Sequence, residues 1–163
     1  MAIKDLLIPE WENEIKITRR MLERVPFEKG DWKPHEKSFT LGRLSTHVAE
    51  IPGWLTMTLT TNELDFAAGG KPNKPATKEE LIQLFETEAA KATALLLEAT
   101  DENFSSNWTL RNGEIIYFTL PKTVVVRNWV LNHIVHHRAQ LSVYLRLLDV
   151  PVPGVYGPSA DET

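Results

Sequence analysis

Two histidines, His133 and His137, stand four residues apart in an apolar stretch of the sequence with helical periodicity. On a helix of about 3.6 residues per turn, side chains with this spacing lie on one face, one turn above the other. Two imidazoles placed in this way can bind the same metal ion. The pair therefore predicts part of a metal site, and the remaining ligands must come from elsewhere in the chain.

A third histidine, His47, lies in another stretch with helical periodicity, three residues after Leu44 and four before Ile51. Its neighbours on that face are apolar, so His47 is predicted to face the protein interior. A buried imidazole without a partner costs about 1–3 kcal/mol, and a shared metal ion would remove that cost. His47, His133 and His137 together match the three-residue ligand set of a catalytic zinc site, which leaves further positions for water or substrate.

Other polar residues near these histidines have several alternative roles. Glu50 stands three residues after His47. It is predicted to have one of four roles: an acceptor that orients a ligand histidine, a further metal ligand, a general base, or an exposed helical glutamate without a role in the site. His136 falls on a partly polar stripe of its helix, which makes it a reserve ligand or a base at the rim of the site. Arg138 and Gln140 are predicted to contact carboxylates, backbone or substrate at the mouth of the site, or to lie at the surface or the bundle end.

The histidine pattern also excludes one class of enzyme. The motif His-Glu-x-x-His is absent, so the spacing does not predict a metalloprotease with its built-in base. His35 stands in a loop with proline and lysine and is predicted to face solvent.

Four segments with apolar residues at three- and four-residue spacing are predicted to be the helices that position these side chains. They cover about 9–24, 41–64, 77–99 and 122–148, with N-caps at Thr40 and Thr77 and a kink at Pro52 inside the second. Asn112 and Gly113 stand between two strand-like runs and predict a β-hairpin with a type I′ turn. These elements predict an all-α fold, a four-helix bundle with long crossover connections and a small hairpin before the last helix.

Composition narrows the class of protein. The 163 residues, 42% hydrophobic, fit one domain over 1–163, and the net charge of −4 argues against a nucleic-acid partner. The chain has no cysteine, so a metal must be bound by histidine, carboxylate, amide or water. The N-terminus lacks the apolar region of a signal peptide, and no run of about 18 apolar residues occurs, so we expect a soluble cytoplasmic protein without a membrane segment.

Several motifs of the chain are familiar in combination. They are Trp32-Lys-Pro, the segment from Leu41 to Glu50 around His47, the segment from Asn132 to Arg146, and the closing segment from Tyr156 to Glu162. On these motifs the chain resembles the DinB family, small bacterial four-helix bundles described together with YfiT-like metal-dependent hydrolases. The resemblance implies an up-down-down-up bundle, homodimers, and a metal bound by His47, His133 and His137. The metal in the family is commonly nickel or zinc, with iron and manganese as alternatives.

The resemblance also suggests a reaction. Characterised relatives include transferases that join a low-molecular-weight thiol, such as bacillithiol, mycothiol or glutathione, to an electrophile, and a maleylpyruvate isomerase. The first hypothesis is therefore metal-dependent thiol transfer to a small-molecule electrophile, with the thiol supplied by a cosubstrate because the chain lacks cysteine. A second hypothesis is hydrolysis by metal-bound water with Glu50 or His136 as base. A third is a metal- or ligand-binding protein without enzymatic activity.

Overall fold

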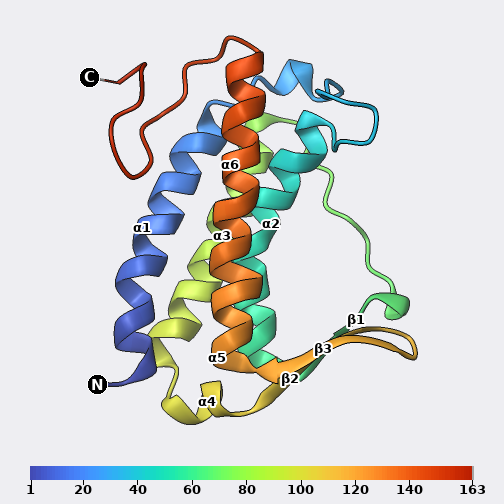
Figure 1. Ribbon diagram of the computed structural model, residues 1–163, viewed down its shortest axis with the longest axis vertical. Coiled ribbons are helices and arrows are strands. Elements are labelled where there is room, and N and C mark those ends of the chain that lie inside the picture. The colour runs from blue at the N-terminus through green and yellow to red at the C-terminus, as the bar shows by residue number, and fades with distance from the viewer. Residues whose placement is uncertain (163) are drawn as a thin grey trace.

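The computed structural model describes residues 1–162 and contains four long helices that lie side by side (Figure 1). They are α1 (Ile3–Glu23), α2 (Leu41–Thr60), α3 (Lys78–Glu98) and α6 (Asn132–Leu147). They run up, down, down and up, so the connection from α2 to α3 has to return along the length of the bundle (Figure 1). The predicted all-α bundle of up-down-down-up type, with a small β element before the last helix, is confirmed.

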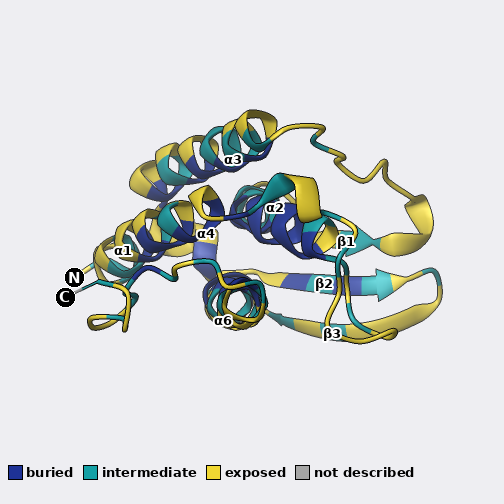
Figure 2. Ribbon diagram, turned by 90° about the horizontal axis from the view of Figure 1, so that it is seen from above, coloured by how far each residue is buried: buried dark blue, intermediate teal, exposed yellow. Residues whose placement is uncertain are grey.

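The helices bury one side each. Figure 2 shows the buried residues on the faces that the helices turn toward one another, with exposed residues outside. The largest fully buried side chains include Trp11 from α1, Leu44 and Leu55 from α2, and Phe85 from α3. This core holds α2 and α6 against each other, and those two helices carry the three histidines singled out in the sequence.

Two helix boundaries differ from the prediction. Helix α1 starts at Ile3, and not near residue 9, and it contains Pro9. The packing of Leu7 and Ile8 on the core offsets the cost of the backbone hydrogen bond that proline cannot donate. Helix α2 begins as predicted, with the Thr40 hydroxyl accepting a hydrogen bond from the backbone N–H of Arg43 at 3.2 Å. It ends at Thr60, however, and not near residue 64.

The residues after α2 form a strand that local periodicity did not show. Strand β1 (Glu63–Asp65) pairs in parallel with β2 (Asn107–Asn112), with Leu64 opposite Leu110. The Thr61 hydroxyl supports this change of direction, since it donates to the carbonyl of Met57 and accepts from the indole N–H of Trp108. The sheet therefore has three strands, in the order β1-β2-β3, where the sequence predicted a hairpin alone.

The hairpin between β2 and β3 (Ile115–Pro121) is confirmed, but its turn is one residue later than predicted. Asn112 pairs with Ile115, so Gly113 and Glu114 form the turn. The backbone φ of Gly113 is +58°. Glu114 is not one of the residues in 1–162 with a positive φ, so its φ is negative. A glycine with positive φ at the first central position alone is the pattern of a type II′ turn, not type I′.

The last helical stretch has the predicted extent but not a uniform pitch. A short α5 (Lys122–Val125) leads into a π-helical segment (Val126–Leu131), which continues into α6. A π-helical turn inserts an extra residue and rotates the faces that follow it. The buried stripe of α6 therefore passes through Ile134, Arg138, Leu141 and Leu145. His133 and His137 share one face of the helix as predicted, but that face lies on the flank of the buried stripe, and both side chains are half-buried.

Candidate metal centre

The bundle brings His47 of α2 together with His133 and His137 of α6. One donor atom from each imidazole can be chosen so that all three lie within 4.8 Å of one another. The Nε2 atoms of His47 and His133 are 3.2 Å apart, and the ring centroids of His47 and His137 are 4.5 Å apart. The sequence thus selected three residues that the fold places in one cluster, while their role as ligands stays a prediction.

The donor set fits a metal ion. Two nitrogens bound to the same tetrahedral zinc at about 2.05 Å lie about 3.3 Å apart. The 3.2 Å between the Nε2 atoms of His47 and His133 matches that separation. His137 is oriented by Gln140, whose amide oxygen lies 2.7 Å from Nδ1 and can accept its proton. This hydrogen bond leaves the Nε2 lone pair of His137 free to bind a metal.

The cluster also favours neutral imidazoles. Burial, followed by repulsion from neighbouring imidazoles, lowers the pKa of His47 to about 3 and the pKa of His133 to about 4. Burial likewise lowers the pKa of His137, against the hydrogen bond with Gln140 that acts to raise it. A metal ligand must be the neutral imidazole, so the three side chains are in the binding form near neutral pH.

These lowered pKa values predict an acid-sensitive metal-free protein. An unfolded imidazole has a pKa of about 6.5, so the unfolded state binds more protons than the folded one as pH falls from about 7 to about 5.5. Protonation of the unfolded forms of His47 and His133 should together lower the free energy of unfolding by about 2 kcal/mol as the pH falls over this range. Urea denaturation with a chelator present measures the loss. A His47→Gln variant should show a shallower pH profile, whereas the exposed His35→Gln control should match the parent protein; equal slopes in all three would contradict the prediction.

Two tryptophans form an aromatic wall beside the histidines. The rings of Trp54 from α2 and Trp129 from the π-helical segment stack with centroids 4.8 Å apart. Trp54 also contacts His133 edge-on at 4.7 Å and His47 at 5.4 Å. The wall restricts water on that side of the cluster. Its signal was present in the sequence, because Trp54 stands two helical turns after His47 and Trp129 one turn before His133.

A family model described as "DinB family" matches residues 1–163. The chain belongs to the DinB family. It is 26% identical over 165 residues to "Uncharacterized protein YrdA" of Bacillus subtilis, an alignment that covers 97% of this chain and 90% of YrdA. The family is generally metal-binding, and the histidine cluster of this DinB chain is a possible three-histidine metal site.

Two solved structures share the fold of the DinB chain. A DinB-like protein from Bacillus cereus has a TM-score of 0.71 and 24% identity, covering 95% of this chain and 98% of its own. The DinB-like protein YjoA from Bacillus subtilis has a TM-score of 0.70 and 16% identity, covering 97% of this chain and 99% of its own. At these identities the likeness establishes the fold. Within residues 1–162, the DinB chain has no helix with the length and apolar character to span a membrane.

Glu50 lies close to His47 in the DinB chain but is held by other groups. Its Oε2 is 4.0 Å from Nδ1 of His47 and 3.3 Å from the guanidinium of Arg43. Its Oε1 accepts a hydrogen bond from the side-chain amide of Asn73 at 3.0 Å. At 4.0 Å Glu50 makes no hydrogen bond to His47, and Arg43 and Asn73 engage its carboxylate, so the arrangement disfavours a free general base and the other roles stay predictions.

His136 and His35 lie where the sequence placed them. His136 is exposed, its ring 4.7 Å from that of His137, and it lines a surface hollow of about 360 Å³ together with His133 and His137. It is therefore available to a molecule that reaches the cluster from this side. His35 is exposed in its loop, and its Nδ1 accepts a hydrogen bond from the backbone N–H of Lys37.

Arg138 is buried and does not lie at the mouth of the site. Only 2% of its surface is exposed, and its guanidinium pairs with the carboxylate of Glu14 in α1 at 2.6 Å. It also donates to the hydroxyl groups of Thr18 at 3.0 Å and Tyr156 at 2.7 Å. Of the contacts considered from the sequence, two are found: one with a carboxylate and one with backbone, the carbonyl oxygen of Glu14 at 3.4 Å. The hydroxyl group of Tyr156 joins the C-terminal tail to this pair, since it accepts from Arg138 and donates to the carboxylate of Glu14.

Gln140 gives a test of the cluster that leaves the three histidines intact. Replacing Gln140 with leucine removes the acceptor that fixes the tautomer and ring orientation of His137. We expect the affinity for zinc to fall about tenfold, measured by competition with a chromophoric chelator. The matched control is Gln83→Leu on the exposed face of α3, which should leave the affinity unchanged. Equal affinities for the two variants would argue against the orienting role.

Proposed function

We propose that this DinB-family chain binds one divalent transition metal ion through His47, His133 and His137. The convergence of the three imidazoles, with donor atoms within 4.8 Å, is the observation that carries the proposal. Imidazole nitrogen is a ligand for zinc, nickel, iron and copper, and zinc and nickel are the first candidates. Manganese and iron are the alternatives to test by elemental analysis.

We further propose that the chain is an enzyme that transfers a low-molecular-weight thiol to a small electrophile. When bound, the metal ion favours the thiolate over the thiol. The thiol comes from a cosubstrate, because the chain has no cysteine. The protein's own groups bind and orient: Gln140 holds His137, and Trp54 and Trp129 exclude water from one side. His136, exposed beside the hollow, accepts the proton that the thiol releases.

Hydrolysis by metal-bound water is the second candidate function. The position of His136 supports hydrolysis as well as it supports thiol transfer. His136 could take a proton from water as well as from a thiol, since it faces the same hollow. Glu50 supports this candidate less, because Arg43 and Asn73 already occupy its carboxylate. The third candidate, a metal- or ligand-binding protein without catalysis, predicts no turnover in either assay described below.

The assembly and location of the protein belong to the same proposal. We infer a homodimer of single-domain chains that acts on small molecules in the cytoplasm. Light scattering on purified protein measures the mass of the assembly, and fractionation of cells locates it. A monomer at micromolar concentration would contradict the dimer.

Two measurements test the function in sequence. Elemental analysis of protein purified without an affinity tag should find about one transition metal per chain. A screen of thiols against electrophiles with the metal-loaded protein should then find turnover that requires both added thiol and metal. Turnover of ester or amide substrates without thiol would establish hydrolysis instead. Protein that contains no metal and fails to bind added zinc and nickel would overturn the proposal.

A further inference from the structure

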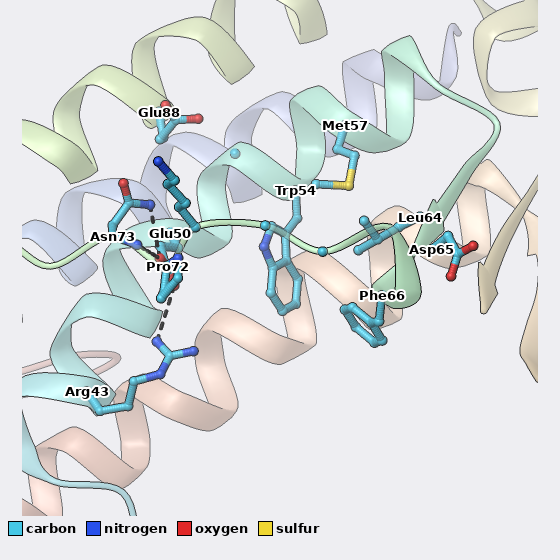
Figure 3. A pocket seen from close by; sticks show the side chains of 14 residues that line it. Arg43, Glu50, Trp54, Met57, Leu64, Asp65, Phe66, Pro72, Asn73 and Glu88 are labelled. Carbon is cyan, nitrogen blue, oxygen red and sulfur yellow. Dashed lines mark hydrogen bonds and ion pairs between the residues drawn. The ribbon is translucent and has the colours of Figure 1, made fainter. Parts of the chain in front are cut away.

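A second cavity, of about 490 Å³, lies between α2 and the loop that follows β1 (Figure 3). Its size is within the range of about 300–1,000 Å³ that is usual for small-molecule sites. The apolar part of its lining comes from Trp54 and Met57 of α2 and from Leu64 and Phe66 beyond it. Figure 3 shows Arg43 on one side of Trp54, with Leu64 and Phe66 on the other. The cavity therefore has an apolar end and a basic end.

The acidic side chains of this cavity are already paired. Asp65 forms an ion pair with Arg111 at 2.6 Å and accepts two backbone N–H groups, and these hydrogen bonds lower its pKa. Glu88 pairs with Lys91 at 3.0 Å. Glu50 accepts hydrogen bonds from Asn73, as described above. Asp65 and Glu50 therefore have little capacity left for a cationic ligand, whereas Glu88 uses only Oε1 in its pair.

The basic side chains of the cavity keep free donors. Lys71 is exposed on the loop and has no ion pair with the residues that the structure describes. Arg43 forms one ion pair, with Glu50 at 3.3 Å, and lies over the ring of Phe39 at 5.5 Å. A guanidinium has five N–H donors, so most of those of Arg43 remain for a ligand. An anionic group can therefore bind at this end of the cavity through Arg43 and Lys71.

We propose that this cavity binds a small carboxylic acid with an aromatic or branched apolar body, its carboxylate on Lys71 and Arg43 and its body against Trp54 and Phe66. A carboxylate matches the planar fork of an arginine, and an aromatic body stacks on tryptophan. The dimensions of the cavity admit one such molecule.

The cavity adjoins the histidine cluster through a shared side chain. Trp54 lines the cavity and contacts both His47 and His133 by its ring. None of the histidines lines the cavity, so Trp54 separates the bound acid from them, and the acid is a ligand of a site that adjoins the proposed metal centre. The binding of the acid does not depend on the proposed function.

Binding can be measured without metal and without turnover. Phenylacetate is titrated into the metal-free full-length protein, with the neutral phenylacetamide as the isosteric probe, and calorimetry gives Kd while NMR follows the indole N–H of Trp54. We expect phenylacetate to bind with a shift of the Trp54 resonance and phenylacetamide to bind at least about tenfold more weakly. Lys71→Met should raise the Kd of phenylacetate about tenfold. Lys74→Met, a lysine of the same loop that lies outside this cavity, is the matched control and should leave the Kd unchanged.

Three outcomes would overturn the carboxylate site. They are equal affinity for phenylacetate and phenylacetamide, equal loss in Lys71→Met and Lys74→Met, and tighter binding of phenyl phosphate than of phenylacetate. Both lysines are exposed, so neither variant should disturb the fold. A protein that binds phenylacetate but no metal would retain this inference and lose the proposed function. A protein that binds metal but not phenylacetate would do the reverse.

Discussion

His137→Ala protein is expected to lose stoichiometric metal, whereas His136→Ala protein is expected to keep it. The two residues are adjacent, yet only His137 lies in the cluster whose donor atoms are within 4.8 Å of one another. Removing one of three protein ligands should lower the affinity for zinc by at least about a hundredfold. Elemental analysis after dialysis, followed by competition titration, measures both the stoichiometry and the affinity.

The controls for this experiment come from the same histidines. His47→Ala and His133→Ala should lose the metal to the same degree, since each supplies one donor. Circular dichroism in the metal-free state shows whether a variant is folded. Retention of metal in His137→Ala together with its loss in His136→Ala would show that the other member of the pair is the ligand.

The features that the sequence predicted well depend on neighbours in the chain. An N-cap hydroxyl and the backbone N–H that it binds are only three residues apart, so the sequence alone can predict it. The structure confirms the caps at Thr40 and Thr77, because each hydroxyl accepts a hydrogen bond from a backbone N–H. The side-by-side position of His133 and His137 also follows from helix geometry, and their rings are 4.6 Å apart. His47 was selected because it is a polar residue on an apolar face, and this proved a sufficient signal for its place in the cluster.

The features that the sequence did not predict depend on distant partners. Strand β1 forms because Glu63 to Asp65 pair with a strand more than forty residues later, and no local pattern contains that information. The π-helical segment before α6 has no sequence rule that would locate it, and it moved His133 and His137 to the flank of the core. The cavity beside Trp54 is lined partly by the loop that follows β1, and no local pattern of the sequence places that loop against α2.

Replacement of Arg138 by methionine is expected to destabilise the protein by about 3–5 kcal/mol. Arg138 is 2% exposed and Glu14 4% exposed, and the guanidinium of Arg138 lies 2.6 Å from the carboxylate of Glu14. The variant therefore leaves a buried carboxylate without its charged partner, and the hydroxyl group of Tyr156 is the remaining donor to it. Chemical denaturation of the full-length protein measures the loss. Arg146→Met is the control, because its pair with Asp161 lies at the surface, where solvent screens the charges, and its loss should change the stability far less.

The double variant Glu14→Leu with Arg138→Met distinguishes an unpaired charge from lost packing. Two apolar side chains of similar size can replace a buried ion pair at little or no cost, so we expect most of the stability to return. A double variant as unstable as Arg138→Met alone would show that the size and shape of the arginine matter more than its charge. Arg138 follows His137 directly in the chain and joins α6 to α1 and to the C-terminal tail. The affinity for zinc should therefore be measured on the double variant and on the parent protein. Equal affinities in the folded double variant and the parent would show that the ion pair stabilises the bundle without setting the geometry of the histidines.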